Sequence, residues 1–379
     1  MLTSMEKLNI LMATPRYYPY VGGVETHVYE VGRRLADYGH RITVLTTMPS
    51  ASAPSLPHEE ESQGMQIIRV PAWPRGRDYY FAPGIRSVIK QTKWDIIHCQ
   101  SCHTFVPLQA MLAAKGAHLP YVLTFHSGGH SSNIRNGIRG LQWKMLRPLL
   151  KNASTLIGVS HFEADYFRDF LHLPTEKFVV ISNGSTLPAL PSSYSVPTGQ
   201  TLIASVGRLE RYKGHQRLIT ALPKIREWYP DARLMIIGSG PYENTLRELI
   251  KITDVDKYVE IISVPSDDRL AMAKLLSQAA LVTLLSDYEA HPVAVMEAIS
   301  LHRPVLVTET SGLKELADQG LVRAIPLQSS PDEVAQAVRK QIEEPVLPPA
   351  SFTLPTWDAC ANQLQEVYQT SIRRQECVS

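Results

Sequence analysis

Two cations lie close together in a loop that glycines bound on both sides. Arg208 and Lys213 are five positions apart in GRLERYKG, which begins at Gly207 and ends at Gly214. An apolar run precedes this segment and an amphipathic one follows it, so we predict a turn between a strand and a helix. Cations at such a turn can neutralise a diphosphate from two directions. Two solvated surface charges are the alternative interpretation.

Two carboxylates lie eight positions apart further along the chain, in SDYEAHPVAVMEAI. Glu289 is expected at the end of a strand, and Glu297 on the helix that follows, whose first turn can hold Pro292. One carboxylate at a strand end and one on a helix can accept hydroxyls from two sugar rings. The alternatives are a charge at the helix start for Glu289 and a salt bridge for Glu297.

Three further candidates follow apolar runs in the sequence. Gly22 and Gly23 open a helix, where free N–H groups and the positive dipole end suit an anion, and Glu25 follows in its first turn. His126 ends the run YVLTFH and precedes a Ser-Gly-Gly segment, a typical place for a site residue. Gly238 opens GSGP, which lacks the later glycine of a dinucleotide fingerprint but can form a tight turn that faces a nucleotide.

Neither the histidines nor the cysteines form a pattern typical of metal ligands. Six of the thirteen histidines fall between His98 and His161, at spacings that match no ligand set. Cys99 and Cys102 have CxxC spacing without a second pair, and four cysteines are too few for a disulfide framework in this chain. We therefore expect reduced thiols, no metal and no cofactor.

The elements that must position these residues alternate along the chain. Short runs rich in Val, Ile and Leu, without strict alternation, are typical of buried parallel strands. In the first half they are residues 8–13, 41–46, 66–70, 95–99, 121–125, 155–160 and 177–182. Amphipathic segments such as Glu25–Asp37 separate them, and the alternation resumes after residue 200. The fold class is predicted to be α/β, with two doubly wound domains whose strands end at one cleft.

Proline-rich stretches mark the predicted boundaries between domains. We expect a first domain over 1–186, a linker over 187–200, a second domain over 201–355, and a last helix within 356–379 that returns to the first domain. No apolar run reaches the ~20 residues that span a bilayer, and no signal peptide pattern opens the chain, so the cytoplasm is the expected compartment.

The net charge of +2 conceals an unequal distribution of charge. Residues 1–200 hold 19 basic and 13 acidic side chains, whereas the remainder holds 19 and 23. No carboxylate lies between Asp95 and Glu163, and a basic segment over residues 133–151 falls in that stretch. Its candidate contacts with an acceptor or membrane are Arg135, Arg139, Trp143, Lys144, Arg147 and Lys151. Glu25, in the first turn of the helix that Gly22 and Gly23 open, is a further candidate contact with the acceptor.

The spacing of four between Arg139, Trp143 and Arg147 predicts a basic amphipathic helix. Such a helix can bind the anionic inner face of the cytoplasmic membrane, with about 1 kcal/mol from each basic residue. Leu141, Met145 and Leu149 are placed on another face. A packed helix with a solvated basic edge is the alternative, and nucleic-acid binding is disfavoured because no recognised motif accompanies the charge.

Taken together, the motifs resemble the retaining GT-B glycosyltransferases of family 4. The resemblance is carried, in order and spacing, by GGVE near the start, TFH at 124–126, GRLERYKG at 207–214, GSGP at 238–241, and Glu289 followed after seven residues by Glu297. It covers nearly the whole chain. It implies a GT-B fold and transfer of a hexose-type sugar from a nucleotide diphosphate donor, with retention and without a metal. The implied acceptor is lipid-linked or a saccharide, in glycan, polysaccharide or glycolipid synthesis.

The resemblance also implies roles for individual residues. Arg208 and Lys213 would bind the donor diphosphate, helped by backbone N–H groups near Gly22 and Gly23. His126 would touch the donor sugar at the reacting centre.

The resemblance implies that the two carboxylates bind different parts of the donor. Glu289 would face the sugar hydroxyls and Glu297 the ribose diol. Where many members have EGFGL, this chain has EAHPV; Pro292 removes one N–H and leaves those of His291 and Val293 to meet the donor. The rival functions are a non-hydrolysing nucleotide-sugar epimerase and a nucleotide-sugar-binding protein without catalysis.

Overall fold

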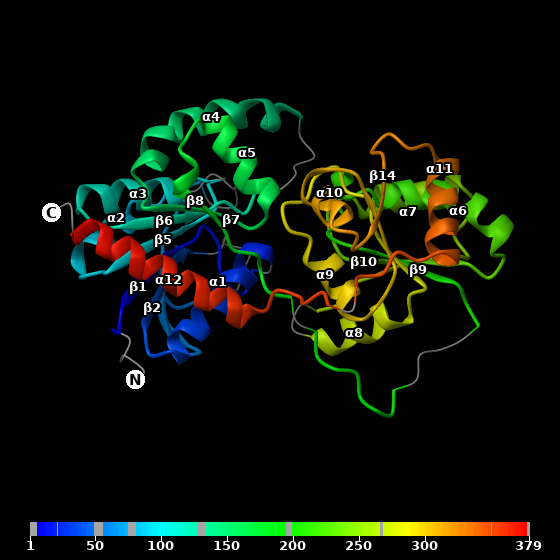
Figure 1. Cartoon of the computed structure of the whole chain (residues 1–379), viewed down its shortest axis with the longest axis horizontal. Coiled ribbons are helices and arrows are strands. Elements are labelled where there is room, and N and C mark those ends of the chain that lie inside the picture. Colours follow the sequence, from blue (N-terminus) through cyan, green and yellow to red (C-terminus); the bar gives the residue numbers. More distant parts are fainter. Residues whose placement is uncertain are drawn as a thin grey trace. The chain divides into compact units, whose positions relative to one another are not determined.

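The computed structural model describes residues 6–20, 22–48, 56–74, 81–102, 104–127, 133–185, 187–194, 199–265, 268–349 and 351–376, without the side chains of 133–142. These residues form two compact units. The first comprises the described residues of 1–127, 134–184 and 355–379, and the second those of 128–133 and 185–354 (Figure 1).

The first unit is built on a sheet with the strand order β3-β4-β2-β1-β5-β6-β7-β8. Neighbouring strands are parallel except for β3, which runs antiparallel to β4 at the edge. The strands are β1 (Asn9–Ala13), β2 (Arg41–Thr47), β3 (Glu59–Ser62), β4 (Met65–Val70), β5 (Ile96–Gln100), β6 (Tyr121–Thr124), β7 (Thr155–Gly158) and β8 (Phe178–Val180).

Helices cover both faces of this sheet (Figure 1). Along β1, Leu11 and Ala13 enter one hydrophobic core, and Ile10 and Met12 enter the core on the opposite face. Because both faces are buried, the inner strands are mostly apolar, as the continuous runs predict. The helices are α1 (Gly23–Asp37), α2 (Gly84–Gln91), α3 (Phe105–Gly116), α4 (Asn133–Asn152), α5 (His161–Leu171), the 3₁₀ helix η1 (Thr175–Lys177) and α12 (Trp357–Glu376).

Strand β3 was not expected from the sequence. Its four residues, EEES, are polar and alternate between exposed and half-buried positions. An edge strand does not need an apolar face, and its charges prevent pairing with another chain. Arg69 on β4 is buried and holds the edge through a 2.6 Å ion pair with Glu60.

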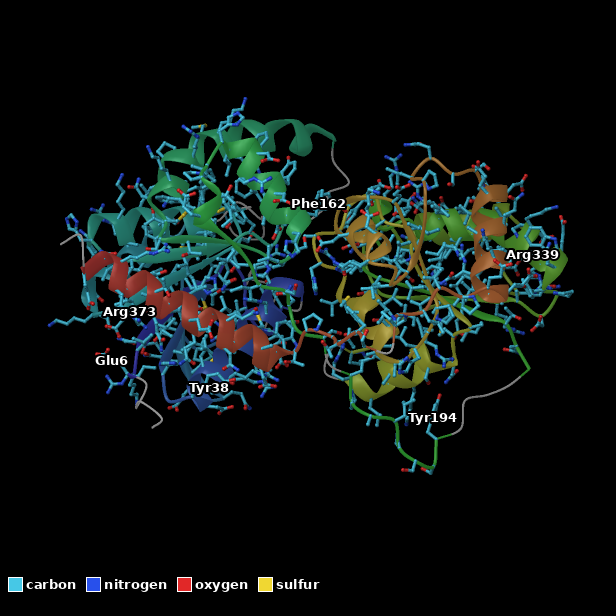
Figure 2. All side chains as sticks on the ribbon, viewed as in Figure 1. Glu6, Tyr38, Phe162, Tyr194, Arg339 and Arg373 are labelled. Carbon is cyan, nitrogen blue, oxygen red and sulfur yellow. The ribbon has the colours of Figure 1, made fainter. Side chains whose placement is uncertain are left out.

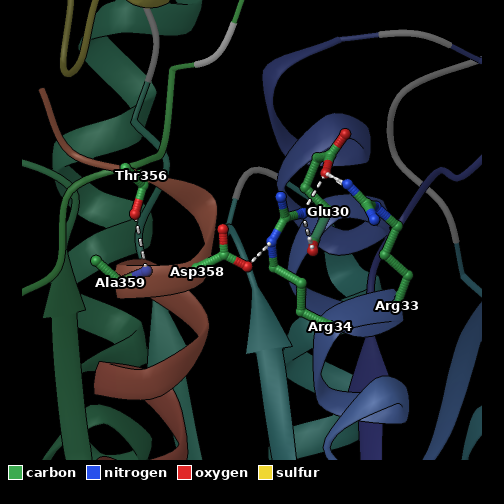
Figure 3. A network of polar contacts seen from close by, with 6 residues as sticks. All are labelled: Glu30, Arg33, Arg34, Thr356, Asp358 and Ala359. Atoms are coloured by element: carbon green, nitrogen blue, oxygen red, sulfur yellow. Dashed lines mark hydrogen bonds and ion pairs between the residues drawn. The ribbon is translucent and has the colours of Figure 1, made fainter.

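Helix α12 is the last element and belongs to the first unit, so the predicted return of the chain is confirmed. Arg34 of α1 donates from Nε to Asp358 at 2.8 Å and also binds Glu30 (Figure 3). Thr356 caps the helix start by accepting from the backbone N–H of Ala359 at 3.1 Å. Further along, the fully buried Tyr368 places its hydroxyl 2.6 Å from His98 on β5.

The second unit has a parallel sheet with the order β11-β10-β9-β12-β13-β14. Its strands are β9 (Leu202–Val206), β10 (Arg233–Ile237), β11 (Val259–Ile262), β12 (Leu281–Leu284), β13 (Val305–Thr308) and β14 (Arg323–Ile325). The helices are η2 (Arg211–Lys213), α6 (His215–Trp228), α7 (Glu243–Ile252), α8 (Arg269–Gln278), α9 (Val293–Ser300), α10 (Ser311–Asp318) and α11 (Pro331–Glu343). The strand order reverses between β9 and β12, where open α/β sheets bind ligands.

The segment that enters the second unit has little regular structure but is tied to α8. Tyr194, marked in Figure 2, donates from its hydroxyl to the carbonyl of Lys274 at 3.1 Å and accepts from Gln278 at 2.8 Å. This segment lies within the predicted linker.

In the parts of the chain that the structure describes, no helix combines the length and apolar character that crossing a bilayer requires. Nor do the described His, Cys, Asp and Glu side chains gather into a group of three or more that could hold a metal ion.

Candidate functional site

The candidate site of the second unit lies at the reversal of its strand order. The loop after β9 carries Arg208 and Lys213, and the loop after the neighbouring β12 carries Glu289. Gly238 follows β10, on the other side of β9. These motifs, which are far apart in sequence, therefore meet at the carboxyl ends of three adjacent parallel strands.

Lys213 and Glu289 form an ion pair at this edge of the sheet. The Lys213 Nζ atom lies 2.5 Å from Glu289 Oε1, with the side chains only 14% and 12% exposed. Burial of the ammonium group lowers the pKa of Lys213, but the Glu289 carboxylate raises it, and the net pKa lies above the ordinary value. Lys213 therefore carries its charge near neutral pH, at a position with little access to water.

Two serines fix Glu289, one in the β12 loop and one at the start of α10. The Ser286 hydroxyl donates to the same Glu289 oxygen at 2.8 Å, and Ser311 accepts from the Glu289 backbone N–H at 2.8 Å. The two loops are joined directly, because the N–H of Asp287 donates to the carbonyl of Tyr212 at 2.7 Å. The pair is thus held by backbone contacts on both sides, and not by two long side chains alone.

Two glycines are required for this close approach of the loops. Gly214 has φ +77, and a Cβ atom there would lie 1.8 Å from the carbonyl oxygen of Leu285. A Cβ atom on Gly238 would lie 1.9 Å from the carbonyl oxygen of Gly207. The glycines that the motifs singled out therefore allow backbone to pack on backbone.

His215 holds the loop that carries Arg208 and Lys213. Its Nδ1 lies 2.8 Å from the Ser205 hydroxyl and its Nε2 lies 3.2 Å from the Arg208 carbonyl. Burial lowers its pKa to about 4, so the ring is neutral at pH 7. A neutral ring with Nε2–H can donate to the Arg208 carbonyl without adding positive charge beside Lys213.

Arg208 differs from Lys213 in its surroundings. Its side chain is 66% exposed and lies 3.3 Å from Glu210. The guanidinium is therefore solvated, as the alternative interpretation of this residue expected, and it can reorient toward an anion with little loss of burial.

Helix α9 carries the remaining predicted donor contacts. Val293 is its first residue and half-buried, and His291 precedes it. Glu297 is 5% exposed and forms an ion pair with Arg269, the first residue of α8. Burial raises the pKa of Glu297 although Arg269 opposes the shift. The salt bridge weighed as the alternative for Glu297 is present.

In the first unit, His126 lies just beyond the end of β6 and is buried. Its backbone has φ +46, which is unusual for a residue with a side chain. Its Nε2 lies 2.8 Å from Oε1 of Gln100, and the ring of His27 packs edge-on with centroids 4.6 Å apart. Three elements thus meet at this ring: β5, β6 and α1.

Gly22 and Gly23, which follow β1, lie at the start of a helix, as the sequence predicts. Gly22 is the N-cap of α1, in an extended conformation, and Gly23 is its first residue. Glu25 is half-buried in the first turn, and a Cβ atom on Gly22 would meet its carboxylate.

Helix α4 corrects the predicted basic face. Trp143 does not face solvent: it is 5% exposed and packs against Phe125 and Phe167, with centroid distances of 5.9 and 4.5 Å. Met145, placed with the apolar residues, is 74% exposed. A spacing of four places residues on one stripe but does not say which stripe faces the core.

The basic residues of α4 have different surroundings. Arg147 donates to the carbonyls of Leu171 and His172, at 2.7 and 3.3 Å, and so caps the end of α5. Lys144 and Lys151 are exposed. The side chains of Arg135 and Arg139 lie outside the described part of the chain.

Several residues of the two sites were not predicted: His27, Gln100, Glu163, Arg269 and Ser286. Each of these residues belongs to no motif and lies in a segment whose sequence is typical of a buried core or of a turn. The signal that could have found Gln100 and His27 is a polar side chain on a stripe otherwise made of buried apolar residues.

Comparison with known proteins matches both units. The model of Glycosyltransferase Family 4 covers residues 21–186, and that of Glycosyl transferases group 1 covers residues 188–351. A phosphatidylinositol N-acetylglucosaminyltransferase chain of Arabidopsis thaliana is 25% identical over 382 residues, which cover 97% of this chain and 83% of that protein.

Solved structures share the fold. Sucrose-phosphate synthase from Thermosynechococcus elongatus has a TM-score of 0.77 at 19% identity, with coverage of 98% of this chain and 100% of that one. HepE of Anabaena in complex with UDP-glucose has a TM-score of 0.69 at 17% identity, with coverage of 98% and 99%.

Proposed function

The chain belongs to the family-4 glycosyltransferases of GT-B fold, and on that premise we propose that it moves a hexose-type sugar from a nucleoside diphosphate donor to a lipid-linked or saccharide acceptor. The observation that carries the proposal is the Lys213–Glu289 pair at the strand-order reversal of the second unit. A buried cation and a carboxylate at such an edge suit a ligand with an anionic and a hydroxylated part.

The pair provides both functions that a sugar diphosphate requires. Lys213 would bind the diphosphate, and the solvated Arg208 would reach it from a second direction. When Lys213 turns to the diphosphate, Glu289 loses its cationic partner and can accept hydrogen bonds from sugar hydroxyls. The Ser286 and Ser311 contacts keep the Glu289 loop in place during this exchange.

The proposed reaction needs charge stabilisation at the leaving group. The bond from the anomeric carbon to the phosphate oxygen breaks, and the acceptor oxygen forms a new bond to that carbon on the same face. The acceptor proton passes to the departing phosphate. Positive charge from Lys213 and Arg208 would stabilise the phosphate oxygens as negative charge develops, without a metal.

Two relatives support the choice of substrates. The Anabaena neighbour is a complex with UDP-glucose, a hexose nucleotide. The Arabidopsis relative is named for transfer of a sugar to phosphatidylinositol, a lipid acceptor. His126 would touch the donor sugar, the N–H groups near Gly22, Gly23, His291 and Val293 would meet the donor, and Glu297 would share the ribose diol with Arg269.

A panel of UDP-, GDP- and ADP-sugars tests the donor directly. One nucleotide class should stabilise the protein, by about 2.7 kcal/mol at 100 times its dissociation constant, with or without EDTA. Lys213→Met should abolish both the stabilisation and transfer while the protein stays folded. Stabilisation that EDTA removes would contradict the metal-free proposal.

The product distinguishes the rival functions. Incubation with donor alone should leave its sugar unchanged, whereas an epimerase would convert it. Incubation with donor and acceptor should give a glycoside with the anomeric configuration of the donor, which NMR coupling constants report. Donor stabilisation without turnover of any acceptor would favour a binding protein.

A further inference from the structure

We infer that Gln100 and Glu163 are positioning residues for His126, which hold its ring in one orientation with the proton on Nε2 and the lone pair on Nδ1. The inference deepens the proposed function, in which His126 touches the donor sugar. All the contacts that carry it lie within the first unit.

The backbone at His126 is held from both sides. The left-handed conformation, with φ +46, is strained for a residue with a side chain and persists only where the surroundings determine it. On one side, the N–H of Phe125 donates to the Ile157 carbonyl at 3.0 Å. On the other, both the backbone N–H, at 2.5 Å, and the hydroxyl of Ser127 donate to Oε1 of Glu163.

Glu163 is an unusual residue to find in this place. It is fully buried in the first turn of α5, and its second oxygen accepts from the backbone N–H of Val159 at 2.8 Å. Burial raises its pKa, while the hydrogen bonds from Ser127 and Val159 act in the opposite direction. A carboxyl group here joins the loop after β6 to the loop after β7.

The ring of His126 is held by Gln100, the last residue of β5. Because Oε1 of the amide faces Nε2 at 2.8 Å, the ring nitrogen donates and the amide oxygen accepts. In neutral imidazole the other nitrogen, Nδ1, is then the acceptor. A hydroxyl of a sugar can donate to that atom.

Gln100 contributes to this contact at the expense of stability. The side chain is fully buried, and its amide nitrogen has no hydrogen-bond partner among the described residues. A buried donor without a partner destabilises the folded state, because its hydrogen bond to water is lost and not replaced. An apolar side chain here would make the folded state more stable. We therefore attribute the amide to its hydrogen bond with His126.

The histidine beside the ring is neutral. His27 places Nδ1 2.8 Å from Oδ1 of Asn183, and burial lowers its pKa to about 4. His98, behind it on β5, is also fully buried with a lowered pKa. Of the described titratable groups, His27 packs against the ring, and Glu163 binds the backbone beside it and not the ring.

The test compares Gln100→Met with Gln341→Met, a second fully buried glutamine. Gln341 makes hydrogen bonds with both amide atoms, to Arg323 and to backbone groups of Val305 and Val346. Gln100→Met should leave the urea midpoint of the first unit unchanged or raise it, yet lower kcat at least tenfold with a change of less than threefold in donor KM. Gln341→Met should lower the midpoint of the second unit and leave kcat unchanged.

The protonated nitrogen is measured without turnover. In full-length protein labelled with ¹⁵N-histidine, long-range ¹H–¹⁵N spectra should show His126 protonated on Nε2, assigned with His126→Gln. In Gln100→Met the signal should become an average of both tautomers. Glu163→Gln, which places an amide donor against donors of Ser127, should lower kcat as Gln100→Met does.

Several results would overturn the inference. They are a wild-type His126 protonated on Nδ1, an unchanged His126 spectrum in Gln100→Met, or a kcat in that variant within threefold of wild type. Failure of the wild type to transfer any sugar would overturn the proposed function instead, and the spectra would still test how His126 is held.

Discussion

Removing the charge of Glu289 should destabilise the second unit by about 3 kcal/mol. Breaking a buried ion pair by removing one partner costs about 3–5 kcal/mol, because the other charge is left buried. We take the lower end because Lys213 and Glu289 keep 14% and 12% of their side-chain surface exposed. Glu289→Gln retains the shape of the side chain and an oxygen that can accept from Ser286, so the loss reports the charge.

Tryptophan fluorination gives an assay that separates the two units. Of the five tryptophans, Trp228 alone lies in the second unit, at the end of α6. Urea unfolding of protein labelled with 5-fluorotryptophan, followed by ¹⁹F NMR, therefore reports the free energy of unfolding of the second unit from the Trp228 signal. The remaining tryptophan signals report the first unit, which should not change.

Two comparisons establish that the effect belongs to the buried pair. The exposed pair of Lys314 and Glu309, with 49% and 45% of the side-chain surface accessible, gives a control in Glu309→Gln, which should cost less than about 1 kcal/mol. The double variant Lys213→Met/Glu289→Gln removes both charges and should cost at least about 1.5 kcal/mol less than the sum of the single variants.

The same variant tests the exchange of partners at Lys213. Without Glu289, the cation has no competing carboxylate, so a nucleoside diphosphate without sugar should bind Glu289→Gln more tightly than wild type. A cost below about 0.5 kcal/mol, or equal costs for Glu289→Gln and Glu309→Gln, would refute the view that this pair is a buried and strongly coupled one.

The remaining predictions concern acid stability and membrane contact. His215 has a pKa of about 4 in the folded chain and about 6.5 when unfolded, so the unfolded state binds the proton first; its contribution is complete above pH 6.5, and about 3 kcal/mol is lost as the pH falls to 4. The Trp228 unfolding midpoint should therefore fall less between pH 7 and pH 5 in His215→Gln than in wild type, and equal slopes would contradict this. If the exposed Lys144 and Lys151 contact an anionic leaflet, replacing both by Gln should weaken binding to phosphatidylserine vesicles at low salt about thirtyfold, at about 1 kcal/mol each. The exposed Lys251 and Lys257 provide the control pair, and negligible wild-type binding would remove the membrane proposal.

Much of the fold could be predicted because burial on both faces leaves a continuous apolar run for each parallel strand. Strand β3 was missed because an edge needs no such run, and its glutamates are typical of loops. On α4, Trp143 and Met145 were placed on the wrong faces, whereas Leu149 is buried and Lys144 and Lys151 are exposed, as a packed helix with a solvated basic edge predicts. The buried stripe of α4 includes Trp143, Leu146 and Leu150. The prediction followed the basic residues at spacings of four and therefore did not identify this stripe.

The site was predicted in part, for a physical reason. The Lys213 and Glu289 positions follow from turn motifs, because glycines and charges at strand ends are local signals. Their ion pair joins residues 76 positions apart, and no local signal reports it. Gln100 was missed for the opposite reason: within a fully buried strand, a single amide looks like a tolerated core residue until the neighbouring strand places His126 against it.

The position of α12 has a consequence for the order of synthesis. Residues 185–354 form the second unit as one continuous stretch, whereas the first unit is completed only by residues 355–379. On the ribosome, the second unit can therefore finish folding while the first still lacks the helix that covers His98. The N-terminal half is synthesised first, but its unit is completed last. A chaperone that shields exposed apolar surface would therefore act on the N-terminal sheet.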